Sequence, residues 1–275
     1  MTIPLLETAL TRMPALGFGT WPMRGAECQA AVESALRLGY RHVDTAEMYG
    51  NEEAVGAALA ASGLPREQLY LTTKVWNDKP RGAEIRRAAE ASLERLRQPH
   101  VDLLLIHWPS PQLDLPDALQ ALARMREEGL ARAVGVANFP LGLLRRAVEL
   151  GIAPLACLQV EHHVYLDQSR LLAYCREQGM ALTSYTPVAK GEVLKDEAIV
   201  RIARKHGATA GQVALAWLLG MEGVAAIPKA ASPERQRENM EAVSLRLDAE
   251  DRAALAALPK DRRMVNPGMA PDWNA

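Results

Sequence analysis

The feature that most constrains the fold is an alternation of short apolar β runs with helical stretches along almost the whole 275-residue chain. Most of the runs are continuously apolar, which is typical of parallel strands buried on both faces. The expected strands are 15–20, 41–45, 69–76, 101–108, 131–138, 155–161, 181–185 and 223–228. Eight such units with right-handed crossovers predict an α/β fold, a single (β/α)8 TIM barrel.

The segments between the strands have helical patterns and helix-start signals. The helix expected at 81–97 carries one apolar stripe, and Thr209 with Gln212 forms a capping box at a later helix start. Further helices are expected at 26–38, 51–62, 116–128, 140–149, 168–178 and 233–241, with two more after an insert that follows residue 185. No linker composition divides the chain, so we expect one domain over 1–275. Residues 258–275 form a tail rich in Pro, Gly and Asn, which we expect to close the active-site side.

Composition restricts the partners. Lys plus Arg is 32 and Asp plus Glu is 33, so no basic excess indicates nucleic acid or a membrane surface. The apolar runs are strand-sized, and the first residues lack the pattern of a signal peptide. Cys28, Cys157 and Cys175 are few and far apart, which argues against disulfides. We therefore expect a cytoplasmic protein, monomeric, with a small-molecule substrate.

Polar residues collect at the expected carboxyl ends of the strands, where barrels place their active sites. These are Asp44 with Tyr49 in the next loop, Lys74, His107, Asn138, Gln159 with Glu161, and Tyr185. Each has an ordinary interpretation, such as a turn former, a packed ring or a core histidine. A Lys that closes an apolar strand, however, needs either a partner or access to solvent. The combination of an acid, a phenol, an ammonium and an imidazole at one rim is far more specific than any member.

This set of groups fits carbonyl chemistry. A phenol keeps its proton at neutral pH, and a nearby ammonium lowers its pKa. A carboxylate beside the ammonium keeps it charged, and an imidazole can hydrogen-bond a substrate oxygen. Such a site can give a proton to a carbonyl oxygen as negative charge develops there. Because it has no strong nucleophile, hydride from a nicotinamide is the expected reductant.

A phosphate site is expected late in the chain rather than near the start. The segment 17–22 contains G-x-G but lacks a third glycine, so it is a poor dinucleotide fingerprint. After the eighth strand, Ser232 has the properties of an N-cap and Pro233 those of the first helical residue. Lys229 and Arg235 lie beside this helix start, which favours an anion. An ordinary charged helix start is the alternative.

The chain resembles the aldo-keto reductase family along nearly its whole length. The matching blocks are LGFGTW, GYRHVDTAEMYGNEEAVG, TTKVW, VDLLLIHWP, VGVANF, LQVEHH, SYTPVAKG and IPKAASPERQRENM, in the family's order. The ending DRRMVNPGMAPDWNA is most similar to that of bacterial 2,5-diketo-D-gluconate reductases, which are also proposed methylglyoxal reductases. The resemblance implies an NADPH-dependent oxidoreductase that reduces small ketones and aldehydes.

The resemblance also implies a role for each matching residue. Tyr49 would be the general acid, Lys74 and Asp44 its tuning pair, and His107 the group that orients the carbonyl. The implied NADP contacts are Gly19, Thr20, Asn138, Gln159, Tyr185, Pro187, Lys190, Gly191, Lys229, Ser232, Arg235, Glu238 and Asn239. Trp21, Trp76, Trp108 and Trp273 would wall the substrate pocket. No metal is implied.

Three positions depart from the family pattern, and two other functions remain as alternatives. Ala137 stands where the family has Ser, Leu158 where it has Asn, and Ala230 where it has Ser beside the phosphate-binding Lys. One alternative is a metal-dependent barrel hydrolase, although adjacent His162 and His163 would point to opposite faces of a strand. The other is a nicotinamide-binding regulatory subunit without activity, which turnover of any aldehyde with NADPH would exclude.

Overall fold

The structure, a computed structural model, describes residues 2–274. Its main sheet has eight parallel strands in sequential order. They are β3 (Phe18–Gly19), β4 (His42–Asp44), β5 (Tyr70–Val75), β6 (Val101–Ile106), β7 (Ala131–Ala137), β8 (Leu155–Glu161), β9 (Ala181–Tyr185) and β10 (Val224–Ala226). A parallel bridge between Leu16 and Ala226, with a 2.9 Å bond from the Gly17 amide to the Ala226 carbonyl, joins the first strand to the last. The sheet is therefore closed.

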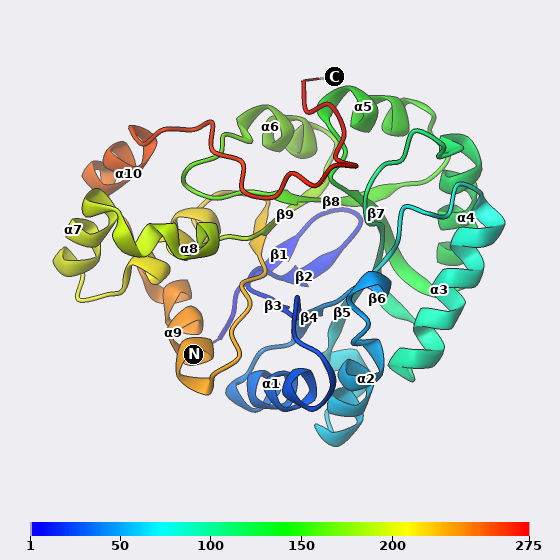
Figure 1. Ribbon diagram of the computed structural model, residues 1–275, viewed down its shortest axis with the longest axis horizontal. Helices are drawn as coiled ribbons and strands as arrows, with labels where there is room; N and C mark the ends of the chain where they lie inside the picture. Colours follow the sequence, from blue (N-terminus) through cyan, green and yellow to red (C-terminus); the bar gives the residue numbers. More distant parts are fainter. Residues whose placement is uncertain (1, 275) are drawn as a thin grey trace.

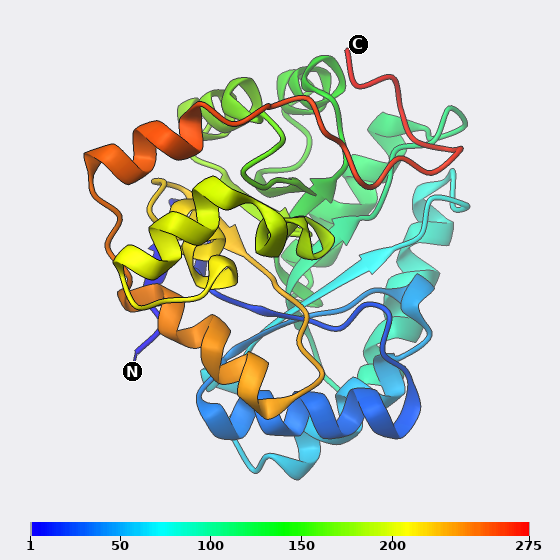
Figure 2. The ribbon, with the colours of Figure 1, turned by 60° about the vertical axis from the view of Figure 1, so that its left-hand side comes forward.

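Helices surround this sheet, as Figures 1 and 2 show. They are α1 (Gly25–Leu38), α2 (Glu52–Ala61), α3 (Gly82–Leu96), α4 (Leu115–Glu127), α5 (Leu141–Glu149), α6 (Ser169–Glu177), α7 (Glu197–Lys205), α8 (Ala210–Leu219), α9 (Pro233–Glu241) and α10 (Ala249–Ala256). The predicted (β/α)8 barrel is confirmed. The capping box at Thr209 and the N-cap at Ser232 are also present.

The first residues form a hairpin that the sequence analysis did not anticipate. Strands β1 (Leu5–Glu7) and β2 (Arg12–Pro14) pair antiparallel in a sheet of their own. The hairpin lies against the amino-terminal ends of the barrel strands, where Thr11 Oγ1 is 2.7 Å from Tyr70 Oη. Met13 is fully buried in the cluster that fills the barrel. One end of the barrel is thus closed, and a ligand site is restricted to the other.

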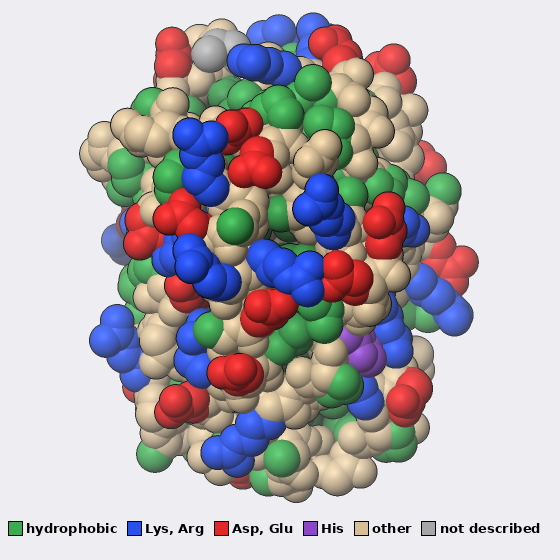
Figure 3. Space-filling model, turned by 90° about the vertical axis from the view of Figure 1, so that its right-hand side faces the viewer, with side chains coloured by type: hydrophobic (Ala, Val, Ile, Leu, Met, Phe, Trp, Pro, Cys, Tyr) green, Lys and Arg blue, Asp and Glu red, His purple; other side chains and the backbone are tan. Residues whose placement is uncertain are grey.

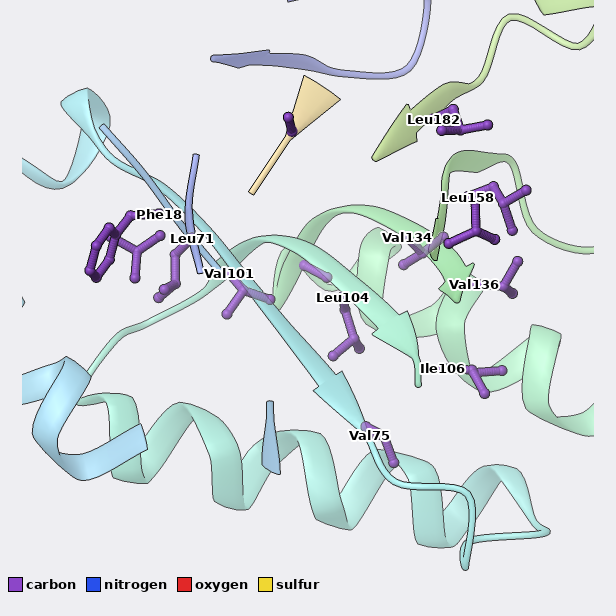
Figure 4. Packing of buried hydrophobic residues seen from close by; sticks show 14 of the residues in the cluster. Phe18, Leu71, Val75, Val101, Leu104, Ile106, Val134, Val136, Leu158 and Leu182 are labelled. Atoms are coloured by element: carbon purple, nitrogen blue, oxygen red, sulfur yellow. The ribbon is translucent and has the colours of Figure 1, made fainter. Parts of the chain in front are cut away.

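The two-residue period of the strands separates two layers of core. Side chains such as Leu71, Leu104 and Leu158 point outward and pack beneath the helices (Figure 4). Inward-pointing side chains, among them Leu105 and Cys157, fill the barrel. At Gly135, which also faces inward, a Cβ would lie 2.3 Å from the Cys157 carbonyl oxygen, so any side chain there is excluded. Close packing inside the barrel leaves the polar strand ends as the open part of the fold.

The surface has mixed charge, as expected from the near-zero net charge. On the face shown in Figure 3, basic and acidic side chains are interspersed rather than gathered by sign. Within residues 2–274, no helix combines the length and the apolar character needed to cross a membrane.

The C-terminal tail crosses the end of the barrel opposite the hairpin (Figure 1). Between α10 and Asn274, the regular structure of the described chain is limited to an isolated bridge between Asp261 and Leu166. Lys260 fixes the start of the tail, because its Nζ donates to the carbonyls of Val164 at 2.6 Å and Leu255 at 2.7 Å. The predicted irregular extension over this side of the barrel is therefore present.

Candidate active site

A buried ion pair forms the base of the site. Lys74 lies near the end of β5 and Asp44 at the end of β4, and both side chains are almost fully buried. Lys74 Nζ donates to Asp44 Oδ1 at 2.5 Å and to the Thr45 carbonyl at 2.8 Å. Burial opposes ionisation of the ammonium, yet Asp44 and Tyr49 outweigh it and hold the pKa of Lys74 above its usual value. Lys74 is therefore a fixed cation inside the barrel.

Tyr49 is positioned over this ion pair by a short 3-10 helix, η1 (Glu47–Tyr49), between β4 and α2. Its Oη lies 3.4 Å from Lys74 Nζ. Burial raises the pKa of Tyr49, and although Lys74 opposes the shift, the pKa stays above its usual value. The ammonium acts to lower the pKa of the phenol, as expected, but burial outweighs it. Tyr49 is a phenol that keeps its proton.

His107 faces the phenol from the loop that follows β6. Its ring centroid lies 5.6 Å from that of Tyr49 and 5.1 Å from that of Trp76. Burial, followed by the charge of Lys74, holds the pKa of His107 well below its usual value. Its Nδ1 is buried and has no hydrogen-bond partner within residues 2–274. A neutral imidazole thus stands beside a protonated phenol.

Asp44, Tyr49 and His107 line a cavity of about 700 Å³ at the open end of the barrel, whereas Lys74 is fully buried and is not part of its wall. Most of the residues predicted for catalysis, cofactor and substrate are on its wall. They are Gly19, Thr20, Trp21, Asp44, Tyr49, Trp76, His107, Trp108, Asn138, Gln159, Tyr185, Pro187, Lys190 and Lys229. Gly191, Ser232, Arg235, Glu238 and Asn239 are not part of this wall. The last four lie at α9, whose Ser232 side chain accepts from the Arg235 amide at 3.4 Å.

Two predicted cofactor residues also support the polar network of the site. Gln159 Nε2 donates to Asp44 Oδ2 at 2.8 Å, so the carboxylate that holds Lys74 has a second partner. Asn138 Nδ2 donates to the His107 carbonyl at 2.9 Å, and its Oδ1 accepts from Tyr185 Oη at 2.8 Å. Asn138 has a positive φ of 62°, a conformation that Asn adopts more readily than most residues. Sequence reasoning had not anticipated these contacts.

Trp273 does not lie on the wall of the cavity, contrary to the prediction. Its indole packs edge-on against Trp108, with centroids 6.0 Å apart, and the Arg263 guanidinium lies 3.6 Å from its ring centre. Its Nε1 donates to Asn266 Oδ1 at 2.9 Å. The ring therefore supports Trp108, which does line the cavity, because Arg263 and Asn266 hold it behind that wall.

The tail contributes wall residues that the sequence analysis did not name individually. They are Met264, Val265, Asn266, Pro267 and Met269, and Met48 joins them from η1. Only the prediction that the tail closes the site indicated them, since a tail without periodicity gives no register. Of the positions that depart from the family, Leu158 is fully buried in the outward-facing core. That departure does not alter the cavity.

The adjacent histidines are involved in local contacts. His162 Nδ1 lies 3.2 Å from Ser184 Oγ, and His163 Nε2 lies 2.9 Å from Glu161 Oε1. In the described part of the chain, no group of three or more His, Cys, Asp or Glu side chains is arranged to hold a metal ion.

The fold and the site define a (β/α)8-barrel oxidoreductase, and comparison with known proteins specifies its family. The model of the Aldo/keto reductase family matches residues 15–260, and the chain belongs to this family. It is 43% identical over 266 residues to methylglyoxal reductase DkgB of Escherichia coli O157:H7, covering 95% of this chain and 99% of that protein. It is 39% identical over 254 residues to an aldo-keto reductase of Mycobacterium sp. (strain KMS), covering 92% and 91%.

Solved structures agree with this assignment. A protein provisionally named 2,5-diketo-D-gluconic acid reductase B superimposes on this chain with a TM-score of 0.95 at 42% identity, over 99% of this chain and 98% of that one. An aldo-keto reductase in complex with NADPH has a TM-score of 0.91 at 31% identity, over 97% and 90%.

Proposed function

We propose that this protein is an NADPH-dependent reductase of small ketones and aldehydes, with Tyr49 as the general acid. The observation that carries the proposal is the contact of the Tyr49 phenol with the buried Lys74–Asp44 pair at the wall of the open cavity. The relatives named as methylglyoxal reductase and as 2,5-diketo-D-gluconic acid reductase B support the substrate class. Methylglyoxal, 2,5-diketo-D-gluconate and similar carbonyls are the proposed substrates.

In the proposed reaction, the substrate oxygen accepts hydrogen bonds from Tyr49 and from the neighbouring His107. The low pKa of His107 keeps its imidazole neutral, so it can orient a carbonyl without competing as the acid. As negative charge develops on the oxygen, Tyr49 gives up its proton, and Lys74 stabilises the resulting phenolate. Trp21, Trp76 and Trp108 restrict water around the reacting carbon.

A nicotinamide dinucleotide would supply the hydride, and the residues of the cavity fit such a group. Gln159 uses its Nε2 for Asp44, which leaves its amide oxygen to accept from a carboxamide. Asn138 is held by two bonds at the same rim, and Tyr185 offers an aromatic face beside it. The loop residues Pro187 and Lys190 line the same cavity, where they would cover the phosphates.

The proposed preference for NADPH depends on the start of α9. Pro233 has no N–H and the Arg235 amide donates to the Ser232 side chain, so what favours an anion here is the positive end of the helix dipole rather than a set of free amides. Lys229 and Arg235 are both exposed beside it and could hold a 2′-phosphate. Ala230, in place of the family's Ser, removes one further donor. The NADPH complex of a relative supports the same choice.

The test is a panel of carbonyls with NADPH, with methylglyoxal, 2,5-diketo-D-gluconate and an aromatic aldehyde as members. We expect turnover by the wild-type protein and loss of about 10²–10⁴-fold or more in Tyr49→Phe, because phenylalanine keeps the ring but has no proton to donate. NADPH titration by fluorescence is the control, since binding should persist. If Tyr49→Phe reduces aldehydes at the wild-type rate, another residue is the acid.

A further inference from the structure

Glu161 is a fully buried carboxylate at the end of β8, and it is not part of the cavity wall. Its Oε1 accepts from the Met264 amide at 2.7 Å, and its Oε2 accepts from the Val265 amide at 3.0 Å. His163 Nε2 lies 2.9 Å from Oε1, and Arg263 Nη1 lies 3.7 Å from Oε2. The carboxylate therefore accepts hydrogen bonds from two consecutive amides of the C-terminal tail.

These two hydrogen bonds are important for the position of the tail, because the tail has little regular structure of its own. Lys260, the bridge of Asp261 and the bond from the Arg262 amide to the Tyr165 carbonyl fix its beginning, and no helix or strand follows as far as Asn274. Met264 is held from both sides, because Lys190 Nζ donates to its carbonyl at 2.8 Å. Lys190 is an exposed side chain of the 3-10 helix η3 (Ala189–Lys195), whereas Glu161 is fully buried at the end of a barrel strand. Glu161 is thus the residue that connects this part of the tail directly to the barrel.

The two tail residues that donate to Glu161 are themselves part of the cavity wall. Met264 and Val265 line it, as do Asn266, Pro267 and Met269 further along the tail. A carboxylate that is removed from water must be compensated by hydrogen bonds, and here the tail amides provide much of that compensation. The same bonds set where this wall of the cavity stands relative to the barrel strands.

We propose that Glu161 is a positioning residue that fixes the tail as a substrate-binding wall, and that it determines affinity for the carbonyl rather than the rate of its reduction. The proposal rests on the reductase activity proposed above. It predicts a change in KM, because the tail contributes surface for the substrate, whereas the proton donor, Lys74 and Asp44 belong to other parts of the barrel.

The experiment is Glu161→Gln, studied by hydrogen exchange and by steady-state kinetics. Glutamine keeps the shape but turns an N–H₂ toward a backbone N–H, so one of the two tail bonds is replaced by a clash of donors. We expect faster amide exchange over residues 262–269. For a 2,5-diketo-D-gluconate-sized substrate, KM should rise roughly tenfold or more, the effect of losing one charge-assisted hydrogen bond. The kcat should stay within about threefold of wild type.

The matched control is Glu222→Gln, the same chemical change at an exposed position before β10, which should alter neither measurement. Val265→Pro removes the N–H that donates to Glu161 Oε2 and leaves the barrel residues unchanged. It therefore tests the role of this hydrogen bond if Glu161→Gln does not fold. It should raise KM in the same direction and speed exchange at Met264.

Unchanged exchange of residues 262–269 in folded Glu161→Gln overturns the proposal. So does a fall in kcat with KM unchanged, since Glu161 would then act on the chemistry. If the wild-type protein reduces no carbonyl, the reductase proposal fails, but the exchange experiment still shows whether Glu161 anchors the tail.

Discussion

Each end of the barrel contains a buried carboxylate paired with a cation, and the two pairs differ in their other partners. At the closed end, Asp102 binds Arg66 at 2.7 Å and also accepts from the Leu71 amide at 2.9 Å. At the open end, Asp44 binds Lys74 at 2.5 Å, and Lys74 reaches the Tyr49 phenol at the cavity wall. The contacts of the first pair are with other protein groups, while those of the second lead to a space that a ligand can occupy.

This comparison shows that a buried ion pair in a barrel does not by itself indicate function. Arg66 also donates to the carbonyls of Leu69 and His100, so it ties together backbone at the ends of two strands. Lys74 instead lies beside the Tyr49 phenol, the proposed proton donor. We therefore expect substitutions at the closed end to change stability with activity preserved, and substitutions at the open end to change activity, and the following predictions test this division.

The largest expected effect is that of Lys74→Met. Without the ammonium, the Tyr49 phenolate of the proposed reaction would lose its stabilising charge, and kcat/KM should fall by about 10²–10⁴-fold. Because Lys74 is the group that opposes the raised pKa of Tyr49, the basic limb of the alcohol oxidation profile should move to higher pH. Lys195→Met, at a largely exposed lysine, is the control. An unchanged limb would make Lys74 a structural residue like Arg66.

The next effect is that of Arg66→Met at the closed end. Removing the cation leaves Asp102 buried with a weaker partner, Arg132, whose Nη1 is 3.3 Å from its Oδ1. Loss of one partner from a buried pair costs about 3–5 kcal/mol, and we expect the lower part of that range in urea unfolding. The kcat/KM should not change. Arg132→Met, at a half-exposed side chain, should cost less than about 1 kcal/mol. A fall in kcat/KM for Arg66→Met contradicts the division between the two ends.

The division also explains which parts of the fold the sequence could predict. Strand ends follow from apolar runs, and the carboxyl ends of neighbouring parallel strands meet at one rim, so Asp44, Lys74 and His107 could be placed together from the sequence alone. The hairpin β1–β2 could not be predicted, because its strands have three residues each and little alternation. The hairpin closes the barrel through contacts between residues that are distant in sequence, such as Thr11 and Tyr70.

The parts of the site without periodicity were the least predictable. Trp273 was assigned to the pocket from the resemblance to the family, but its position depends on Arg263 and Asn266 within the tail. The bonds from Glu161 to the tail join residues about a hundred positions apart, and no local pattern indicates them. The sign of the Tyr49 shift also required the structure, since it is the balance between burial and Lys74.

His162 lies at the open end but is buried against α8 rather than in the cavity. Its substitution therefore tests whether a residue at this end that does not line the cavity changes stability and leaves activity unchanged. Its ring packs on Trp217, with centroids 5.5 Å apart, and burial, with the nearby His163 and Lys260, lowers its pKa to about 3. The unfolded chain takes up this proton below a pKa of about 6.5, and the folded protein does not until about 3. Acidification through this window must therefore favour unfolding.

We expect the unfolding free energy to fall by about 2 kcal/mol between pH 7 and pH 5 through this residue alone. In His162→Gln that part of the slope should disappear, while activity at pH 7 is kept. Urea unfolding at both pH values measures it. Equal slopes in the two proteins would mean that His162 is charged in the folded state or exposed to water.

The smallest expected effect is that of Arg235→Ala, at an exposed residue in the first turn of α9. A guanidinium that binds a 2′-phosphate contributes a charge-assisted hydrogen bond, reduced here by exposure, so the Kd for NADPH should rise about tenfold. The Kd for NADH should hardly change, since NADH has no phosphate at that position. Wild-type protein should prefer NADPH by roughly 10²-fold. Fluorescence titration of both cofactors against both proteins measures these values, and Arg237→Ala, on the same helix, is the matched control. Because Arg235 is exposed, unfolding in urea should be unaffected, unlike that of Arg66→Met. Equal weakening of both cofactors would place the phosphate site elsewhere and assign Arg235 to the adenine or to the helix.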